Sequence, residues 1–362
     1  MRYLNLLLIV FVSACSVFAQ GIVVDHTCAD LDEIPSIWIT AAQNTIQSHY
    51  AHTSHGGQLT YGIGFVEDDD PFYDCEIGSR YLPAVSGAYC VFDGQETVSY
   101  ITPALYWETA AGLDLTRAVL DNNPTLDTSM WSWCCQCNSY SEAQVQAYLD
   151  ALTMLEGEYP DVTFIYLTGN AQGTGSGGYN RLQRNNQIRD YCAANDKVLY
   201  DFADLDCWWF NPSTSSWEQN TYEYGGTDVP SQHPQYAEEQ CAHTTYESCT
   251  IKGRAWWWMM AVLAGWTSTG ISREEADTGL SFSLSTANPV SVPFSVSVSV
   301  PIQCELSVMV YDVTGRETAG VVSGAFGPGE YSFTVNGLNE GVYFIGVNDG
   351  HSFTSHRTVV VN

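Results

Sequence analysis

The stretch SEAQVQAYLDALTMLEGEYPDVTFIYL, residues 141–167, contains the clearest helix and strand of the chain. Ser141 is followed three residues later by Gln144, a capping-box pattern that predicts the start of a helix. The apolar residues that follow recur at helical spacing: Val145, Leu149, Leu152 and Leu155. Gly157 ends this helix, and the continuous apolar run at 162–167 predicts a buried strand. A helix and a buried strand in succession are typical of an α/β domain.

Segments of the same two kinds alternate along residues 35–266. Helical spacing predicts further helices at 36–46, 113–122, 180–194 and 253–266. The runs between them predict further strands at 47–51, 128–131 and 198–202. Strands separated by helices predict a parallel sheet with helices on both faces. Ligands of such sheets bind beyond the carboxyl ends of the strands. That rule places Ser54 and the segments 131–137, 169–178 and 201–206 around one crevice.

The composition changes after Trp266. Residues 267–280 are polar and are predicted to form a linker. From 281 to 362 short alternating runs dominate, such as FSVSVSV at 294–300, and turn sequences separate them. Strict alternation with regular turns predicts a small β-sandwich.

The first residues predict the cellular compartment. Arg2 precedes an apolar run at 6–12, and a series of small residues ends at Ala19. This order is typical of a secretory signal peptide, so we expect residues 1–19 to be removed and the α/β domain to span 20–266. The apolar run is too short to cross a bilayer, and no transmembrane segment is predicted. The sequence VSAC at 12–15 also fits a lipoprotein cleavage box, so a lipid-anchored form is the alternative.

Composition and charge exclude several classes of partner. Of the 362 residues, 45% are apolar, which is enough for a substantial core and too many for a disordered chain. The formal net charge is −29, and Lys197 and Lys252 are the only lysines. So acidic a chain repels the phosphates of nucleic acids and the surface of anionic membranes. We therefore expect no nucleic-acid partner.

The chain has twelve cysteines, and in an exported protein disulfides are their usual state. Cys75 with Cys90, and Cys241 with Cys249, are close enough in sequence to close small loops, although spacing alone does not determine the connectivity. Three more cysteines crowd into residues 134–137. No histidine lies near them in the chain and a second Cys-x-x-Cys pair is missing, so zinc is disfavoured there. We expect no metal and no cofactor.

The last 75 or so residues contain motifs in a distinctive order. They are Asn288-Pro289, VMVYDVTGR at 308–316, the segment 327–331 and GVYF at 341–344. In this order they resemble the C-terminal sorting domain of type IX secretion substrates. The resemblance implies recognition by the type IX secretion machinery and export to the medium or the outer cell surface of a Gram-negative bacterium. An ordinary immunoglobulin-like accessory module is the alternative.

Ser54 and His243 are the candidate catalytic pair. Serine is a poor nucleophile at neutral pH unless a base takes its proton and donors stabilise the oxyanion. Ser54 follows a predicted strand and precedes Gly56 and Gly57, which let the backbone turn sharply and approach a substrate. His243 lies on a loop just before the last predicted helix. Surface histidines and a metal pair at His52 and His55 are the alternative interpretations.

These residues, in this order, resemble the SGNH (GDSL-like) hydrolases, which place a serine after the first strand and a histidine ahead of the last helix. The resemblance spans residues 35–266 and implies a flavodoxin-like parallel sheet and ester hydrolysis without a cofactor. It assigns the oxyanion donors to Gly112, which opens a helix, and to Gln136, in the segment where the family has Gly-x-Asn-Asp.

Two departures from the family concern the motif and the acid. Neither Gly-Asp-Ser at Ser54 nor Gly-x-Asn-Asp near residue 132 is present. The family's acid lies three residues before the histidine, where this chain has Gln240. Glu239 is the candidate acid in its place, and Asp204, Asp206 or a backbone carbonyl are the alternatives.

The remaining candidate residues concern the substrate. His52, His55, Asn170 and Trp133 flank the predicted strand ends and are expected to bind the substrate. With an aromatic crevice and an exported chain, we expect a secreted serine esterase that removes acyl groups, such as acetyl groups, from a polysaccharide or an acylated small molecule. A catalytically inactive glycan-binding protein at the cell surface is the alternative, because the motifs of the second half are degenerate.

Overall fold

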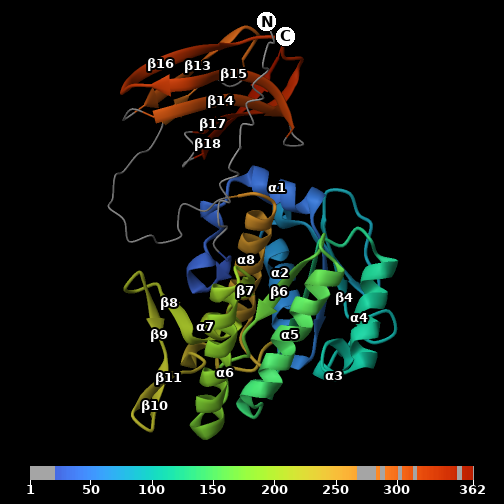
Figure 1. Ribbon diagram of the computed structural model, residues 1–362. Helices are drawn as coiled ribbons and strands as arrows, with labels where there is room; N and C mark the ends of the chain where they lie inside the picture. Colours follow the sequence, from blue (N-terminus) through green and yellow to red (C-terminus); the bar gives the residue numbers. More distant parts are fainter. Residues whose placement is uncertain are drawn as a thin grey trace, which may run out of the picture.

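The computed structural model describes residues 21–266, 283–285, 290–300, 304–312, 316–348 and 353–361 (Figure 1). The predicted signal peptide at 1–19, the lipoprotein box and the predicted linker at 267–280 lie outside the described residues.

The first part of the chain is built on a seven-stranded sheet with the order β1-β7-β6-β5-β2-β4-β3. Every neighbouring pair in it is parallel. Its strands are β1 (Val23–Val24), β2 (Gln47–His52), β3 (Cys75–Ser79), β4 (Tyr89–Asp93), β5 (Thr128–Ser132), β6 (Thr163–Leu167) and β7 (Val198–Tyr200). The predicted α/β domain with a parallel sheet is therefore confirmed.

Eight α-helices are described within residues 21–266. They are α1 (Ser36–Thr45), α2 (Gly57–Asp69), α3 (Pro103–Tyr106), α4 (Ala110–Asn122), α5 (Glu142–Glu158), α6 (Gly175–Ala194), α7 (Phe202–Cys207) and α8 (Tyr246–Leu263). The predicted capping box at the start of α5 is confirmed, because Ser141 and Gln144 each bond the other's backbone N–H. α8 starts earlier than the predicted Gly253, since Thr245 caps it by accepting from the Ser248 N–H.

Helices cover both faces of the sheet. Successive residues of a strand point to opposite faces, and in β2 Tyr50 packs against Trp256 of α8, whereas His49 stacks on Tyr106 of α3. The polar residues of this strand are buried with partners: the two ring nitrogens of His49 lie 2.8 Å from Ser129 Oγ and 2.8 Å from the Gly94 carbonyl. β2 can therefore occupy an interior position of the sheet, between β5 and β4, without the apolar sequence that interior strands usually have.

Helices α2 and α8 cross at two glycines. A Cβ atom at Gly62 would lie 2.1 Å from the Cys249 carbonyl oxygen, and one at Gly253 would lie 2.2 Å from the Gly62 carbonyl. Only glycine allows two helix backbones to approach this closely. This contact fixes the start of α8, and with it the preceding loop, relative to α2.

Two short hairpins between α7 and α8 were not predicted from the sequence. They are formed by β8 (Trp208–Asn211) with β9 (Ser216–Gln219), and by β10 (Thr221–Tyr224) with β11 (Thr227–Pro230). Each strand has only four residues. Such short strands give too little alternation to be recognised in a sequence.

The C-terminal part contains two antiparallel sheets, with the orders β12-β13-β16 and β15-β14-β17-β18. Their strands are β12 (Ser283–Ser285), β13 (Phe294–Val300), β14 (Cys304–Asp312), β15 (Glu317–Phe326), β16 (Gly329–Val335), β17 (Gly341–Asn348) and β18 (Phe353–Val360). The alternation predicted at 294–300 is present, because Val296 and Val298 are buried whereas Ser295 and Ser297 are exposed. Both sheets contribute to one hydrophobic cluster, for example Val296 from the first and Val308 from the second.

The ten cysteines described with their side chains are all free thiols. Cys75 is paired across β3 and β4 with Tyr89, so Cys90 points to the opposite face of the sheet and cannot bond to Cys75. The short separation of Cys75 and Cys90 in the sequence therefore does not indicate a disulfide between them. The sulfur atoms of Cys241 and Cys249 are 2.8 Å apart, so this predicted pair is brought together.

Candidate active site

The candidate site lies beyond the carboxyl ends of β2, β5 and β6, where ligands of parallel sheets bind. Ser54 lies two residues after the end of β2 and opens η3 (Ser54–Gly56), a single helical turn that runs into α2. The Cys134–Cys135 segment follows β5, and the segment 168–172 follows β6. The loop that carries His243 approaches from the start of α8.

Ser54 and His243 meet although they are far apart in the sequence. Ser54 Oγ lies 3.1 Å from His243 Nε2, and His243 Nδ1 lies 3.1 Å from Glu239 Oε1. The His243 side chain is 43% exposed and the Glu239 side chain is 76% exposed. Solvent screens a carboxylate this exposed, so Glu239 acts on His243 mainly by fixing the orientation of its ring.

His243 lies at the tip of a tight turn in a costly backbone conformation. Cys241 and Thr244 exchange both backbone hydrogen bonds, at 2.9 and 3.0 Å. The two residues between them, Ala242 and His243, have φ angles of 44° and 71°. Two-residue turns with two positive φ angles favour Asn-Gly, and each non-glycine residue there costs on the order of 1 kcal/mol. Such strain persists only where the surroundings impose it.

The surroundings of the turn supply that constraint. Gln58 Nε2, from α2, donates to the Ala242 carbonyl at 2.8 Å. Gln172 Nε2, from the segment after β6, donates to the His243 carbonyl. Both carbonyls of the strained turn are therefore held by amide groups from other elements, and these bonds direct the His243 ring to Ser54.

His55 lies next to His243. Its ring stacks on that of His243 with a centroid distance of 4.6 Å and an interplanar angle of 27°. Its Nε2 is 2.6 Å from Gln172 Oε1, and its Nδ1 is 3.0 Å from Cys134 Sγ. Burial alone would lower the pKa of His55, but the hydrogen bonds with Cys134 and Gln172 outweigh it and raise the pKa.

Two adjacent thiols complete this cluster. Cys134 Sγ and Cys135 Sγ are 3.9 Å apart. The hydrogen bond with Cys135, together with that to His55, holds the pKa of the Cys134 thiol well below its usual range although burial opposes it. The same hydrogen bond and burial raise the pKa of Cys135. Cys134 is therefore the more acidic of the two thiols.

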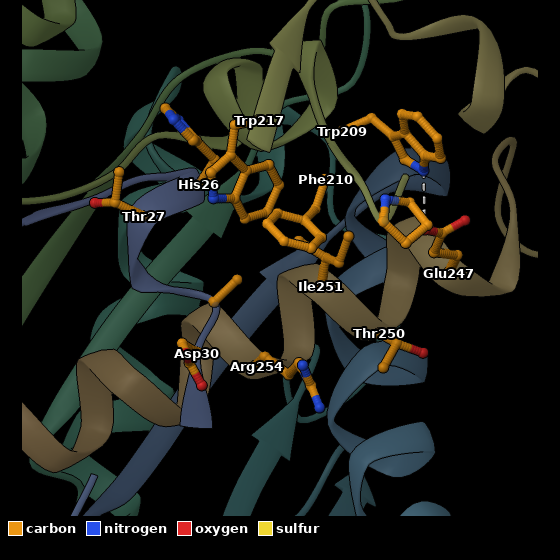
Figure 2. A pocket seen from close by; sticks show the side chains of 12 residues that line it. His26, Thr27, Asp30, Trp209, Phe210, Trp217, Glu247, Thr250, Ile251 and Arg254 are labelled. Atoms are coloured by element: carbon orange, nitrogen blue, oxygen red, sulfur yellow. Dashed lines mark hydrogen bonds between the residues drawn. The ribbon is translucent and has the colours of Figure 1, made fainter. Parts of the chain in front are cut away.

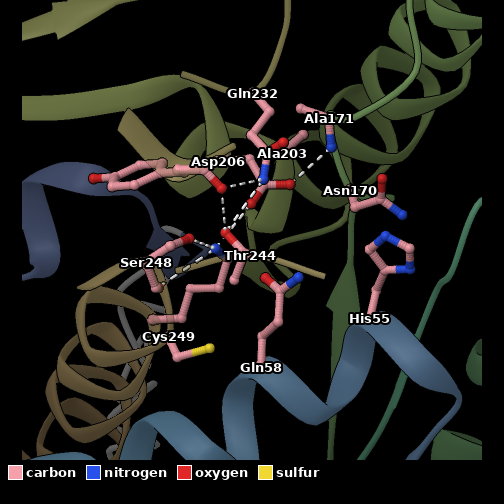
Figure 3. Close-up of polar contacts among 12 residues, drawn as sticks. His55, Gln58, Asn170, Ala171, Ala203, Asp206, Gln232, Thr244, Ser248 and Cys249 are labelled. Atoms are coloured by element: carbon pink, nitrogen blue, oxygen red, sulfur yellow. Dashed lines mark hydrogen bonds and ion pairs between the residues drawn. The ribbon is translucent and has the colours of Figure 1, made fainter. Parts of the chain in front are cut away.

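A buried ion pair supports the segment after β6 (Figure 3). Asp206 of α7 and Lys252 of α8 are almost fully buried, and Asp206 Oδ1 lies 2.8 Å from Lys252 Nζ. Asp206 Oδ2 accepts the Ala171 N–H at 2.8 Å, and Lys252 Nζ donates to Ser248 Oγ at 2.6 Å. The pair therefore connects two helices to the residue that precedes Gln172.

The two predicted oxyanion donors differ in outcome. The Gly112 N–H donates to Thr109 Oγ1 at 3.0 Å as part of the N-cap of α4, and the glycine packs tightly against the Ala104 carbonyl. Its amide is already satisfied, so the assignment of Gly112 as an oxyanion donor was wrong. Gln136 lies beside the site, where its Oε1 accepts the Cys134 N–H at 2.7 Å and its amide nitrogen is the end that could donate to a substrate.

The predicted substrate-binding residues are mostly interior. Trp133 is only 1% exposed, and its Nε1 donates to the Leu167 carbonyl at 2.9 Å, so it is a core residue and its assignment to the substrate was wrong. His52 Nε2 is paired with Asp93 at 3.1 Å. Asn170 is buried and donates to the Cys134 carbonyl at 2.7 Å. His52, His55 and Asn170 therefore bond to other residues of the protein around the site.

The alternative acids are used elsewhere. Asp206 is bound to Lys252, and Asp204 Oδ1 lies 2.5 Å from His26 Nδ1. Gln58 and Gln172 were not singled out in the sequence, because an amide side chain carries no local pattern. Lys252 had a usable signal: it is a rare lysine inside a strongly apolar helix, and a buried lysine requires a partner.

A separate pocket of about 710 Å³ lies between η1 (His26–Cys28), the β8–β9 hairpin and α8 (Figure 2). Trp209, Phe210 and Trp217 supply its aromatic surface, and Glu247 and Arg254 supply charged groups. Trp209 Nε1 donates to Glu247 Oε1 at 3.0 Å, which fixes the indole at the rim. Aromatic faces beside a few placed polar groups are typical of ligand pockets.

Comparison with known proteins identifies the C-terminal part. The secretion system C-terminal sorting domain family matches residues 288–362. These residues are a type IX sorting domain. The protein is therefore exported by a Gram-negative bacterium of the Bacteroidetes type, either released or displayed on the outer cell surface. None of the helices in the described residues combines the length and hydrophobicity that a membrane span requires.

No curated protein matches the chain. Domains 4 and 5 of the S-layer protein SbsC are 26% identical over 22% of this chain, with a TM-score of 0.18, and the chain spans about half, 51%, of that structure. The CARDB domain of a Pyrococcus furiosus protein is 19% identical over an alignment that covers 23% of this chain and 87% of the CARDB structure, with a TM-score of 0.18. The alignment with an engineered protein covers 85% of this chain and 60% of the engineered protein at 10% identity, with a TM-score of 0.21.

Proposed function

We propose that this exported protein is a serine ester hydrolase that removes acyl groups from a polysaccharide. The observation that carries the proposal is the 3.1 Å distance from Ser54 Oγ to His243 Nε2, with Glu239 on the other ring nitrogen. A nucleophile, a base within hydrogen-bond reach and a group that orients the base are the common requirement of such enzymes. We also propose that the sheet is flavodoxin-like. Five neighbouring strands lie in the order β4-β2-β5-β6-β7, and when these five are renumbered 1 to 5 along the chain this order becomes 2-1-3-4-5, as in flavodoxin.

The geometry supports a two-step reaction. Ser54 Oγ would attack the ester carbonyl while His243 Nε2 takes its proton, and the imidazolium would then protonate the departing sugar hydroxyl. A water molecule, deprotonated by the same nitrogen, would hydrolyse the acyl-serine and release the acid. Glu239 would keep the His243 Nδ1–H in place, so that Nε2 is the nitrogen free to accept the proton.

The start of η3 offers donors for the oxyanion. Ser54 and His55 are its first residues, and the first amides of a helix have no intrahelical partner. η3 runs directly into α2, and the N-terminal end of a helix carries a partial positive charge. Gln136 supplies a further amide group from the segment after β5. Donors fixed in advance contribute most to such reactions.

The experiment compares variants of the mature chain on aryl acetates and acetylated polysaccharides. We expect Ser54→Ala and His243→Gln to reduce kcat/KM by at least about 10³-fold, because they remove members of one catalytic unit. Glu239→Gln should cost less than about tenfold, since this exposed carboxylate contributes little energy. The exposed Ser213 provides a control, and Ser213→Ala should be unaffected. Full activity of Ser54→Ala would end the proposal.

A second candidate, an inactive glycan-binding protein, is favoured by the aromatic pocket in Figure 2. Sugar rings stack on exposed aromatic faces, and Trp209, Phe210 and Trp217 line this pocket. An active-serine phosphonate probe separates the two candidates. Labelling of Ser54 supports the hydrolase, whereas binding of oligosaccharides by a chain that the probe does not label supports the binding protein.

A further inference from the structure

Three metal-binding side chains converge beside Ser54, from two strand ends. His55, Cys134 and Cys135 each present one ligand atom, and these atoms lie within 4.8 Å of one another. His55 Nδ1 is 3.0 Å from Cys134 Sγ, and the two sulfurs are 3.9 Å apart. Zinc was disfavoured in the sequence because no histidine is near the cysteines, but the parallel sheet supplies His55 from the neighbouring strand.

The distances match a tetrahedral ion. With Zn–S bonds of about 2.3 Å and Zn–N bonds of about 2.0–2.1 Å, tetrahedral angles place two sulfurs about 3.8 Å apart and a sulfur about 3.6 Å from a nitrogen. The observed separation of the two sulfurs, 3.9 Å, is close to the first value. The His55 ring would move by about half an ångström to reach the second.

The contacts of His55 make Nδ1 the ring nitrogen that faces the thiols. The amide nitrogen of Gln172 donates to the His243 carbonyl, so its oxygen is the atom that faces His55 Nε2. That oxygen can only accept, and Nε2 therefore carries the proton. Nδ1 then faces the sulfurs, and the proton that it shares with Cys134 Sγ would leave when a metal binds. Metal-binding histidines usually have their second nitrogen fixed in this way.

Asn170 supports the thiols. Its Nδ2 donates to the Cys134 carbonyl at 2.7 Å and lies 3.8 Å from Cys135 Sγ. The first contact holds the cysteine segment, and the second places a donor next to a sulfur that would be charged when it binds a metal. Donors of this kind adjust ligand charge at metal sites.

We propose that His55 Nδ1, Cys134 Sγ and Cys135 Sγ bind a zinc ion. Two thiolates and an imidazole select zinc over the hard cations magnesium and calcium. Three protein ligands leave a fourth position for water or a substrate oxygen, the arrangement of zinc sites that take part in chemistry. Binding releases two protons to solvent, one from the Cys135 thiol and one that Cys134 and His55 share in their hydrogen bond, and no oxidation is involved. The site does not depend on Ser54 as a nucleophile.

The test is metal binding by the full mature chain, purified with a mild reductant and freed of metal. Titration with Co²⁺ should saturate at about one equivalent and produce the near-ultraviolet thiolate-to-cobalt absorption of a tetrahedral site, which Zn²⁺ should displace. Cys135→Ser, at an exposed position, should abolish this absorption, and so should His55→Ala. Gln172→Ala should weaken zinc binding about 10–100-fold.

Two variants serve as controls. Cys137→Ala changes a cysteine of the same segment that lies outside the cluster and should bind Co²⁺ normally. Ser54→Ala should also bind normally, which separates this proposal from the esterase. Two results would overturn the zinc site: a cobalt complex without thiolate absorption, or a Cys134–Cys135 disulfide in protein isolated from the medium without reductant, detected by mass spectrometry.

Discussion

Replacement of Lys252 by methionine removes one member of the buried pair with Asp206. Both side chains are almost fully buried, and the Lys252 ammonium, 2.8 Å away, compensates the charge of Asp206. Removing one partner of a buried ion pair leaves an uncompensated charge and costs about 3–5 kcal/mol. For a domain of this size the loss corresponds to a fall in Tm of about 6–20 °C.

The other lysine of the chain provides the matched control. Lys197 pairs with Glu156 at 2.5 Å, but both side chains are about one-fifth exposed. Water screens this pair, so Lys197→Met should cost no more than about 1 kcal/mol. Thermal unfolding followed by near-ultraviolet circular dichroism measures both variants, because the tryptophans of the α/β domain report on its packing.

A double variant separates charge from packing. Lys252→Met with Asp206→Asn removes both charges and keeps an oxygen to accept the Ala171 N–H, so it should recover most of the lost stability. Ester hydrolysis should follow the same order, since Asp206 fixes the segment that holds Gln172 against His243. The reasoning is refuted if Lys252→Met costs less than about 1 kcal/mol, or if the double variant is as unstable as the single one.

Two further predictions concern α2 and β2. Gly62→Ala should destabilise the protein by at least about 2 kcal/mol, because its Cβ would meet the Cys249 carbonyl. Gly64→Ala changes a glycine of the same helix that faces open space, and it should stabilise the protein by about 0.5–1 kcal/mol. Equal effects of the two variants in urea unfolding would contradict the close contact between the helices. Burial lowers the pKa of His49, whose ring packs on Tyr106, to about 4, although the nearby charge of Asp93 opposes this shift. Up to about 3 kcal/mol of stability should therefore be present above pH 6.5 and be lost as the pH falls to 4. His49→Gln should flatten that dependence in the same pH range, and an unchanged slope would count against this origin.

Much of the fold was predictable because its rules are local. The helical period of α5, its capping box and the alternation of β13 depend on residues close in sequence, and the structure contains all three. The sorting-domain motifs at 288–362 were recognisable for the same reason. The short strands of the 208–230 hairpins and the early start of α8 were not, since they depend on contacts with the rest of the domain.

The site was predictable only in part. The position of Ser54 at a strand end follows from the topology of parallel sheets. Trp133 was misassigned because the sequence does not show that its ring is buried in the core. Gly112 was misassigned because the sequence does not show that its N–H is already bonded to Thr109. Gln58 and Gln172, which hold the His243 turn, have no sequence pattern because their role depends on carbonyls that only the folded chain presents to them.

The sequence by itself determined export, the α/β and β-rich parts, and which residue types were available for chemistry, because these depend on composition and short-range periodicity. Tertiary structure alone decided that Ser54 meets His243, that His55 meets Cys134, and that Lys252 meets Asp206. Each of these pairs joins positions far apart in the chain, and their distances are set by the order of parallel strands and by the glycine contact between α2 and α8. Such long-range distances have no counterpart in local sequence patterns.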